Sequence, residues 1–156
     1  VLSATINQYA YASLRPRRDS RLTLASLDYD VVARYDHPRR LKLDGNLDLI
    51  KSVVRAFKVR RGADLWVHSD APPGSGLGSS STLVVALIGV MSEWLGRPLT
   101  AYDVAELAYR IERVDLGLAG GRQDQYAAAF GGFNFGEFGP DATVVIALLI
   151  LSDVLY

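Results

Sequence analysis

The chain has 156 residues, enough for one domain with a core of its own, and 49% of them are apolar, which excludes a disordered chain. Its 17 basic and 17 acidic residues balance, so the composition predicts no nucleic-acid partner, and its apolar runs are too short to span a bilayer. There is no cysteine, which excludes disulfides and thiolate chemistry and fits a cytoplasmic location.

The chain opens with segments of β-pattern. Residues 1–14 and 21–25 alternate partly between apolar and polar positions on either side of a charged turn, which predicts a β-hairpin. Residues 29–34 predict a third strand. The apolar run at 63–68 predicts another strand, separated from the first three by a helical pattern.

The other apolar segments have helical spacing, which predicts helices over 46–59, 79–95, 101–114 and 123–130. Asn46 is the expected N-cap of the first helix, and Thr100 with Asp103 is expected to form a capping box before the third. Strands are expected at 133–138 and 143–151. Strands and helices in this mixed order predict an α+β fold.

A loop rich in glycine and serine joins the strand at 63–68 to the helix at 79–95. Glycine lacks a Cβ, so the loop backbone can turn sharply and approach a ligand closely. The N–H groups at a helix start have no helical acceptor, and the helix dipole there favours an anion. The loop therefore predicts a phosphate site, and its candidate residues are Pro73, Gly74, Ser75, Gly76, Leu77, Gly78, Ser79, Ser80 and Ser81.

The loop differs from two common phosphate-binding motifs. No lysine follows its last glycine, which excludes a Walker A motif, and Ser79 stands where a dinucleotide fingerprint needs a third glycine. Instead the loop resembles, nearly residue for residue, the P-P-x-x-G-L-G-S-S-[SA] loop of the GHMP kinases. These are small-molecule kinases that include galactokinase, homoserine kinase and mevalonate kinase.

Two carboxylates extend the resemblance. Alone, Glu112 reads as a solvated helix residue, Asp124 as a helix-start residue that binds backbone amides, and Arg122 as a surface residue. Their order changes this interpretation, because the spacing from Glu112 to Asp124 is similar to that between the family's magnesium carboxylate and its catalytic aspartate. The block at 120–132 looks most like the sugar-kinase branch, and within it the D-glycero-D-manno-heptose 7-phosphate kinases.

The resemblance implies a fold and a chemistry. The fold would be the ribosomal-S5-like domain of this family, a mixed sheet with helices on one side. ATP would bind at the loop and Mg²⁺ at Glu112 with Ser80, with Ser79 as an alternative ligand. Asp124 would be the general base for a sugar hydroxyl, and Arg122 would stabilise developing charge or bind an acidic substrate. Arg15, Arg17 and Arg18 are either partners for an acceptor phosphate or a solvated turn.

The resemblance covers about residues 1–138 and lacks two family elements, an N-terminal glycine motif and a C-terminal domain. We therefore expect residues 1–156 to be a single partial ATP-binding domain of a longer kinase, with poor turnover alone. The alternatives are an inactive nucleotide-binding or regulatory domain and a kinase for fucose- or galactose-type sugars. An RNA-binding domain of the same fold is disfavoured by the neutral charge. A homodimer is left open.

Overall fold

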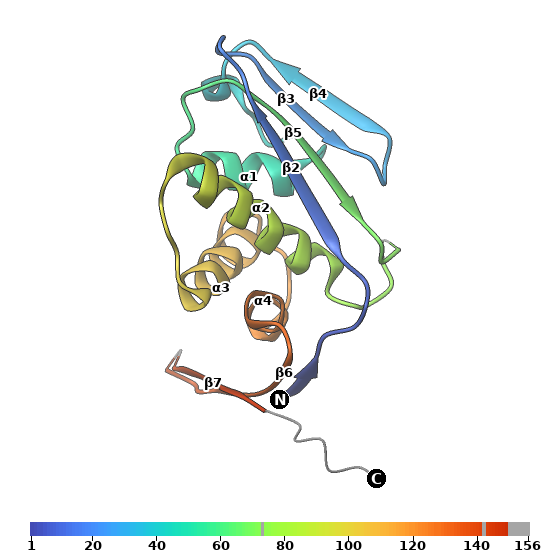
Figure 1. The fold of residues 1–156 in the computed structure, drawn as a ribbon, viewed down its shortest axis with the longest axis vertical. Helices are drawn as coiled ribbons and strands as arrows, with labels where there is room; N and C mark the ends of the chain where they lie inside the picture. Colours follow the sequence, from blue (N-terminus) through green and yellow to red (C-terminus); the bar gives the residue numbers. More distant parts are fainter. Residues whose placement is uncertain (73, 142, 150–156) are drawn as a thin grey trace.

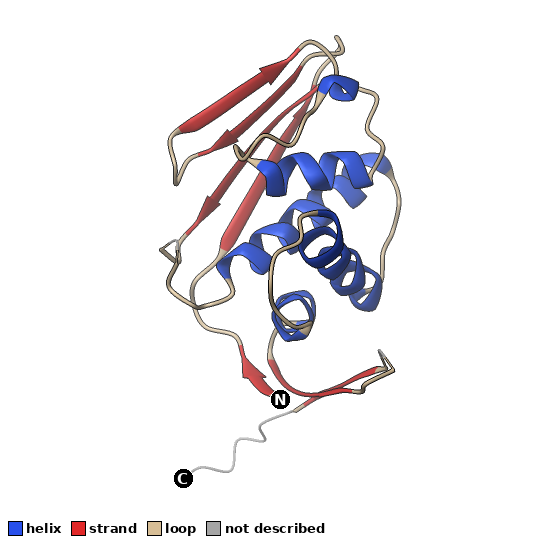
Figure 2. Ribbon diagram, turned by 180° about the vertical axis from the view of Figure 1, so that it is seen from behind, coloured by secondary structure: helices blue, strands red, loops and turns tan. Residues whose placement is uncertain are grey.

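The computed structural model describes residues 1–72, 74–141 and 143–149. A larger sheet carries the helices on one face, and a smaller sheet lies at the end of the molecule where the chain starts (Figures 1 and 2). The strands are β1 (Leu2–Ala4), β2 (Ala10–Pro16), β3 (Leu22–Ser26), β4 (Val31–Tyr35), β5 (Ala63–Ser69), β6 (Phe133–Phe138) and β7 (Val144–Leu148). The helices are η1 (Pro38–Arg40), α1 (Asp48–Ala56), α2 (Ser79–Leu95), α3 (Ala101–Tyr109), the π-helical segment η2 (Arg110–Asp115) and α4 (Gln123–Phe130).

The larger sheet has the order β2-β5-β3-β4, with β5 antiparallel to β2 and parallel to β3. The predicted hairpin between 1–14 and 21–25 is therefore wrong, because β5 separates these segments and β3 forms a hairpin with β4 instead. Alternation marks the strands but not their partners. Strands β5 and β3 are the two inner strands, and both carry almost fully buried residues, among them Leu65 and Leu24, as is typical of strands with neighbours on both sides.

Helices α1 and α2 pack on one face of this sheet and form the core with it (Figure 2). The α+β fold with helices on one side is thus confirmed. The predicted capping box of Thr100 and Asp103 is present at the start of α3. The N-cap expected at Asn46 is wrong: α1 begins at Asp48, whose carboxylate accepts hydrogen bonds from the N–H groups of Asp44 and Gly45.

The smaller sheet has the order β1-β6-β7 and lies beside α4 (Figure 1). Its last strand covers Val144–Leu148 of the predicted strand at 143–151, of which residues 150 and 151 lie outside the described residues. The helix predicted at 101–114 changes at Arg110 from α to π geometry. In the part of the chain that the structure describes, no helix is both long and apolar enough to cross a membrane.

Candidate active site

The loop between β5 and α2 has the backbone that its glycines predict. Gly74, Gly76 and Gly78 have φ values of 76°, 74° and 70°, in the left-handed region that strains residues with a Cβ. Gly78 is the N-cap of α2 and offers no side-chain cap, so no side chain of the described residues occupies the first N–H groups of α2, which can face a ligand. Pro73, also predicted to bind phosphate, lies outside the described residues.

Glu112 is fully buried beneath this loop. Its Oε1 accepts a hydrogen bond from Ser80 Oγ at 2.7 Å, and its Oε2 accepts one from Ser81 Oγ at 2.7 Å. The alternative interpretation of Glu112 as a solvated helix residue is wrong. Its place in the wider π turn of η2 explains this, because the turn changes the direction in which side chains leave the helix.

A residue that the sequence reasoning missed completes this cluster. Gln125 is fully buried, and its Nε2 donates to Glu112 Oε2 at 2.6 Å and to Ser81 Oγ at 3.1 Å. The carboxylate therefore has three neutral donors, and no ion pair among the described residues includes it. A buried carboxylate beside a serine hydroxyl is a set of hard oxygen ligands, the kind that Mg²⁺ prefers.

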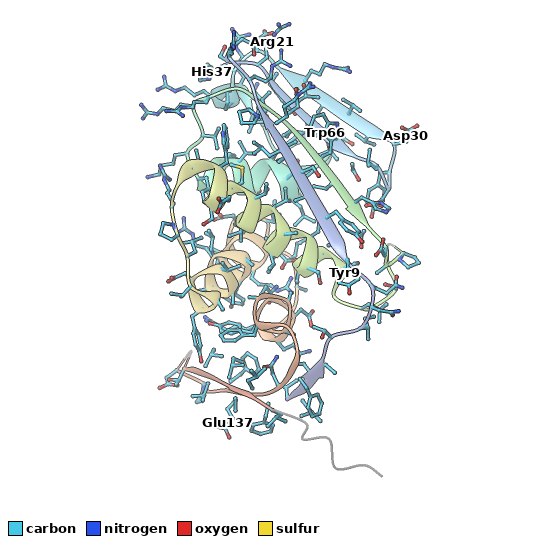
Figure 3. The ribbon with its side chains drawn as sticks, viewed as in Figure 1. Tyr9, Arg21, Asp30, His37, Trp66 and Glu137 are labelled. Carbon is cyan, nitrogen blue, oxygen red and sulfur yellow. The ribbon has the colours of Figure 1, made fainter. Side chains whose placement is uncertain are left out.

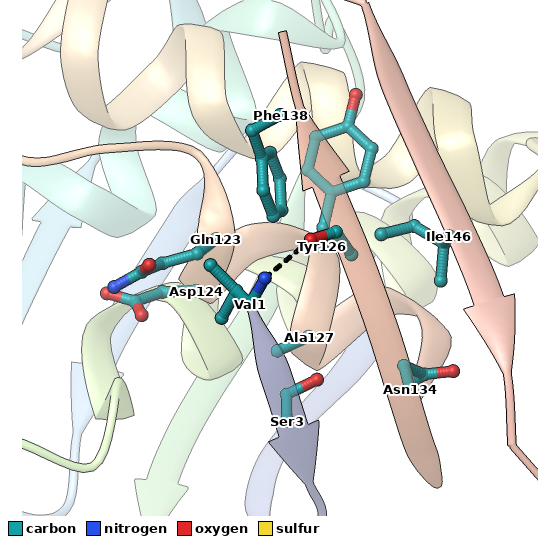
Figure 4. A pocket seen from close by; sticks show the side chains of 10 residues that line it. Val1, Ser3, Gln123, Asp124, Tyr126, Ala127, Asn134, Phe138 and Ile146 are labelled. Carbon is teal, nitrogen blue, oxygen red and sulfur yellow. Dashed lines mark hydrogen bonds between the residues drawn. The ribbon is translucent and has the colours of Figure 1, made fainter.

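Asp124 lies directly across from the start of α2. A Cβ built on Gly78 would be 3.7 Å from Asp124 Cβ and 3.8 Å from its Cγ, which is ordinary van der Waals contact and shows how near the two residues are. Asp124 borders a cleft of about 470 Å³ that is also lined by Tyr9 and Ser79. On its other side Asp124 borders a smaller cavity of about 120 Å³ near the β1-β6-β7 sheet (Figure 4). Its carboxylate thus stands between the phosphate loop and space for a second ligand.

Arg122 has partners on α3. Its Nη1 donates to Glu106 Oε2 at 2.7 Å, and its guanidinium carbon lies 4.1 Å from the centre of the Tyr109 ring. Tyr126 donates its hydroxyl to the same Glu106 oxygen at 3.2 Å, and burial together with this carboxylate raises the pKa of Tyr126. These contacts fasten the start of α4 to α3, and they direct the guanidinium toward α3.

A second cavity, of about 500 Å³, adjoins the first turns of α2. Its walls come from the start of α1, from β3 and β4, from Leu83 of α2 and from the chain after η2, and they are largely apolar: the lining includes Val31, Leu47, Ile50, Leu116 and Leu118. The sequence analysis did not find this cavity. Its residues are scattered over five stretches of the chain, including Val67 of β5, and no local pattern joins them.

Two of the arginines considered for an acceptor phosphate are engaged elsewhere. Arg15 Nη2 lies 2.7 Å from Asp64 Oδ2, and Arg17 Nη1 lies 3.2 Å from Asp64 Oδ1. Both are near the end of β2 that is remote from Tyr9, which is one of the residues that line the cleft beside Asp124 (Figure 3). Their described contacts are those of an ion-pair cluster around the buried carboxylate of Asp64.

Residues 48–132 match the family model of the GHMP kinases N terminal domain, and the chain therefore belongs to the GHMP kinase family. Within it, D-glycero-alpha-D-manno-heptose 7-phosphate kinase of Campylobacter jejuni is 47% identical in an alignment that covers 98% of this chain and 47% of the relative. The chain thus spans about half the length of that curated relative.

Solved structures agree on the fold. A D-glycero-D-manno-heptose 1-phosphate kinase from Bacteroides thetaiotaomicron has a TM-score of 0.92 at 42% identity, over 97% of this chain and 51% of that one. Lactococcus lactis galactokinase complexed with galactose has a TM-score of 0.81 at 22% identity, over 97% of this chain and 42% of that one, which shows the shared fold alone. The recognition of the family from its loop and its two carboxylates is thus confirmed.

Proposed function

We propose that the protein containing this chain is an ATP-dependent sugar kinase whose acceptor is D-glycero-D-manno-heptose 7-phosphate and whose product is the 1,7-bisphosphate. The observation that carries the proposal is the convergence at the start of α2 of free N–H groups, the Glu112 cluster and Asp124. The names of the Campylobacter and Bacteroides relatives support a heptose phosphate, although they put its phosphate at different positions.

ATP would bind on both sides of the first turn of α2. Residues 74–81 would hold the phosphates through backbone N–H groups and serine hydroxyls, Ser81 contributing only its N–H because its buried hydroxyl is bonded to Glu112. The apolar cavity beside Leu83 suits a flat base, because ligand pockets are mostly apolar with few polar groups. The γ-phosphate would then point toward Asp124 and the cleft that it borders.

Magnesium would be held by Glu112 and Ser80. The residues fit the ion, since the hydroxyl of Ser80 contacts Glu112 Oε1 and the Ser80 residue is exposed to solvent. Among the described residues there is no cluster of three acidic or histidine ligands, but Mg²⁺ commonly takes only one or two ligands from protein. When bound, the ion would neutralise charge on the β- and γ-phosphates.

The chemical step would take place beside Asp124. The acceptor hydroxyl oxygen forms a bond to the γ-phosphorus, the bond from that phosphorus to the β-phosphate oxygen breaks, and ADP leaves. Asp124 accepts the hydroxyl proton as the new bond forms. Arg122, two residues earlier, would contribute by fixing the start of α4 through Glu106 and Tyr109.

The test is a phosphorylation assay of the full-length protein with ATP and a panel of heptose 7-phosphate, galactose and fucose. We expect turnover with the heptose phosphate. Asp124→Asn should lower kcat by about 10²–10⁴-fold while ATP affinity stays unchanged. Asp115→Asn, an exposed change at the end of η2, is the matched control and should retain activity.

Other outcomes separate the alternatives. Turnover with galactose or fucose alone would replace the heptose assignment. ATP binding without phosphorylation of any acceptor would favour an inactive nucleotide-binding domain. The 156-residue chain tested alone should turn over poorly, because part of the family's site is expected outside it; robust turnover would contradict that expectation.

A further inference from the structure

Gln125 is the one residue of the Glu112 cluster to which the proposed reaction gives no role. It follows Asp124 directly, and its side chain is fully buried although an amide gains little from burial unless it is bonded. Its Oε1 has no partner among the described residues, whereas its Nε2 has two. The amide is thus oriented so that its N–H groups, and not its carbonyl oxygen, make the hydrogen bonds.

The two carboxylate oxygens of Glu112 accept hydrogen bonds from different donors. Oε2 accepts from Gln125 Nε2 and from Ser81 Oγ, and both donors are buried. The other oxygen, Oε1, is left to Ser80, which lies at the solvent side. The chemistry fixes the amide's orientation, because a carbonyl turned toward the carboxylate would set two acceptors against each other.

The position of Gln125 in α4 connects two parts of the site. Successive residues of a helix point about 100° apart, so the turn that directs Asp124 to the cleft directs Gln125 to Glu112. The same short helix therefore sets both the general base and the carboxylate. A shift of α4 would move Asp124 and break the hydrogen bond from Gln125 to Glu112 together.

We propose that Gln125 is a positioning residue, which holds the Glu112 carboxylate so that Oε1 faces Ser80 and the ATP-bound metal. The inference rests on the proposed kinase function and extends it to a residue that touches neither ATP nor acceptor. Residues that orient a metal ligand typically change metal affinity by about 10–100-fold when they are replaced.

The test is the Mg²⁺ concentration that gives half-maximal enhancement of ATP binding, measured by calorimetry on the full-length protein. Gln125→Met keeps the length of the side chain and removes the amide. We expect it to raise this Mg²⁺ concentration by about 10–100-fold while ATP binding in EDTA stays unchanged. Ser81→Ala removes the other donor to Oε2 and should shift it in the same direction, which keeps the test available if Gln125→Met fails to fold.

Ile88→Val is the control, since it removes a methylene group from a buried residue of α2 that makes none of the cluster's hydrogen bonds. An unchanged Mg²⁺ concentration in folded Gln125→Met would overturn the inference and leave the kinase proposal intact. An equal shift in Ile88→Val would also overturn it, because the effect would then be general destabilisation. Absence of Mg²⁺-dependent ATP binding in the unaltered protein would overturn the kinase proposal and the inference with it.

Discussion

Two buried carboxylates in different parts of the fold have opposite surroundings. Asp64, on β5, is 3% exposed and lies within 3.2 Å of the guanidinium groups of Arg15 and Arg17. Glu112, on η2, is 0% exposed and has only neutral donors among the described residues. The fold thus supplies its own cations around Asp64. Around Glu112 it places hydroxyl and amide groups, as expected where a ligand brings the cation.

A third buried charge behaves like Asp64. Lys51 of α1 is fully buried and is paired with Asp44 and Asp48. Burial alone would lower the pKa of Lys51, but hydrogen bonds to Asp44, Tyr35 and Asp48 outweigh it, and the net pKa is raised. The buried charges of Asp64 and Lys51 are thus each paired with opposite charges, as expected for clusters that stabilise the structure. Glu112 is the buried charge that lacks such a partner among the described residues.

The largest expected effect follows from removing the charge of Glu112. Glu112→Gln should lower kcat by about 10³-fold, since a metal ion contributes several kcal/mol to stabilising the transition state. The free energy of unfolding should change by no more than about 1 kcal/mol, because the change replaces a buried charge that has no cation. Kinetic assays and urea unfolding of the same variant check both parts, and a large loss of stability with normal turnover would reverse the assignment.

The next effect concerns the glycine loop. Gly78→Ala should lower activity about tenfold or more and destabilise the fold by about 1–2 kcal/mol, because alanine is strained at its φ of 70° and its Cβ would contact Asp124. Gly89→Ala is the matched control within α2, where a Cβ meets nothing within 4 Å. It should stabilise the helix by about 0.5–1 kcal/mol and leave activity unchanged. Similar activities for the two variants would exclude a special role of the loop.

Substitution in the ion-pair cluster of Asp64, Arg15 and Arg17 should have the opposite effect to substitution of Glu112. Asp64→Asn should lower the free energy of unfolding by about 1–3 kcal/mol, because two arginines lose a buried anionic partner. Activity should stay within about twofold of the unaltered protein, since the cluster is remote from the cleft. Urea unfolding and a kinase assay decide this. A loss of turnover without a loss of stability would mean that the two clusters do not divide structure from function.

The smallest expected effect is the dependence of stability on pH. Burial raises the pKa of Asp64, but hydrogen bonds from Arg15, Thr23 and Arg17 lower it by more than burial raises it. The net pKa of Asp64 therefore lies below the ordinary 3.8. A hydrogen bond from Lys51 likewise lowers the pKa of Asp44. Such carboxylates stabilise the fold above their unfolded pKa, and this stability is lost as the pH falls through their lower folded pKa.

Urea midpoints should therefore be steady between about pH 5 and 7 and fall below about pH 4. Asp64→Asn should make the acid loss shallower, because one of the depressed groups is absent. A midpoint that falls steeply between pH 7 and 5 would point to groups other than these carboxylates.

Local patterns predicted much of this fold. The positions of α2 and α4, the capping box at Thr100 and the α+β class follow from periodicity and turn chemistry, which depend on neighbouring residues. Strand pairing was not predictable in this way, because β5 pairs with β2 and β3, from which it is separated by many residues of the sequence. The π turn at η2 was also missed, since no residue of the segment marks the extra residue per turn.

The candidate site likewise has parts that the sequence predicted and parts that it did not. The loop was identified by its glycines and serines, and the roles of Glu112 and Asp124 were inferred from a family resemblance that is now confirmed. Their roles in this chain, the homodimer and the cytoplasmic location stay predictions. Gln125 and the apolar cavity beside Leu83 were missed because their contacts depend on tertiary structure.

The most direct test of the central claim, that Glu112 takes its cation from the ligand, is calorimetric titration with ATP in the presence and absence of Mg²⁺. It should be made on the full-length protein, on Glu112→Gln and on Asp64→Asn. We predict that Mg²⁺ strengthens ATP binding to the unaltered protein and to Asp64→Asn, and that Glu112→Gln loses most of this enhancement. Equal enhancement by Mg²⁺ in all three proteins would contradict the claim.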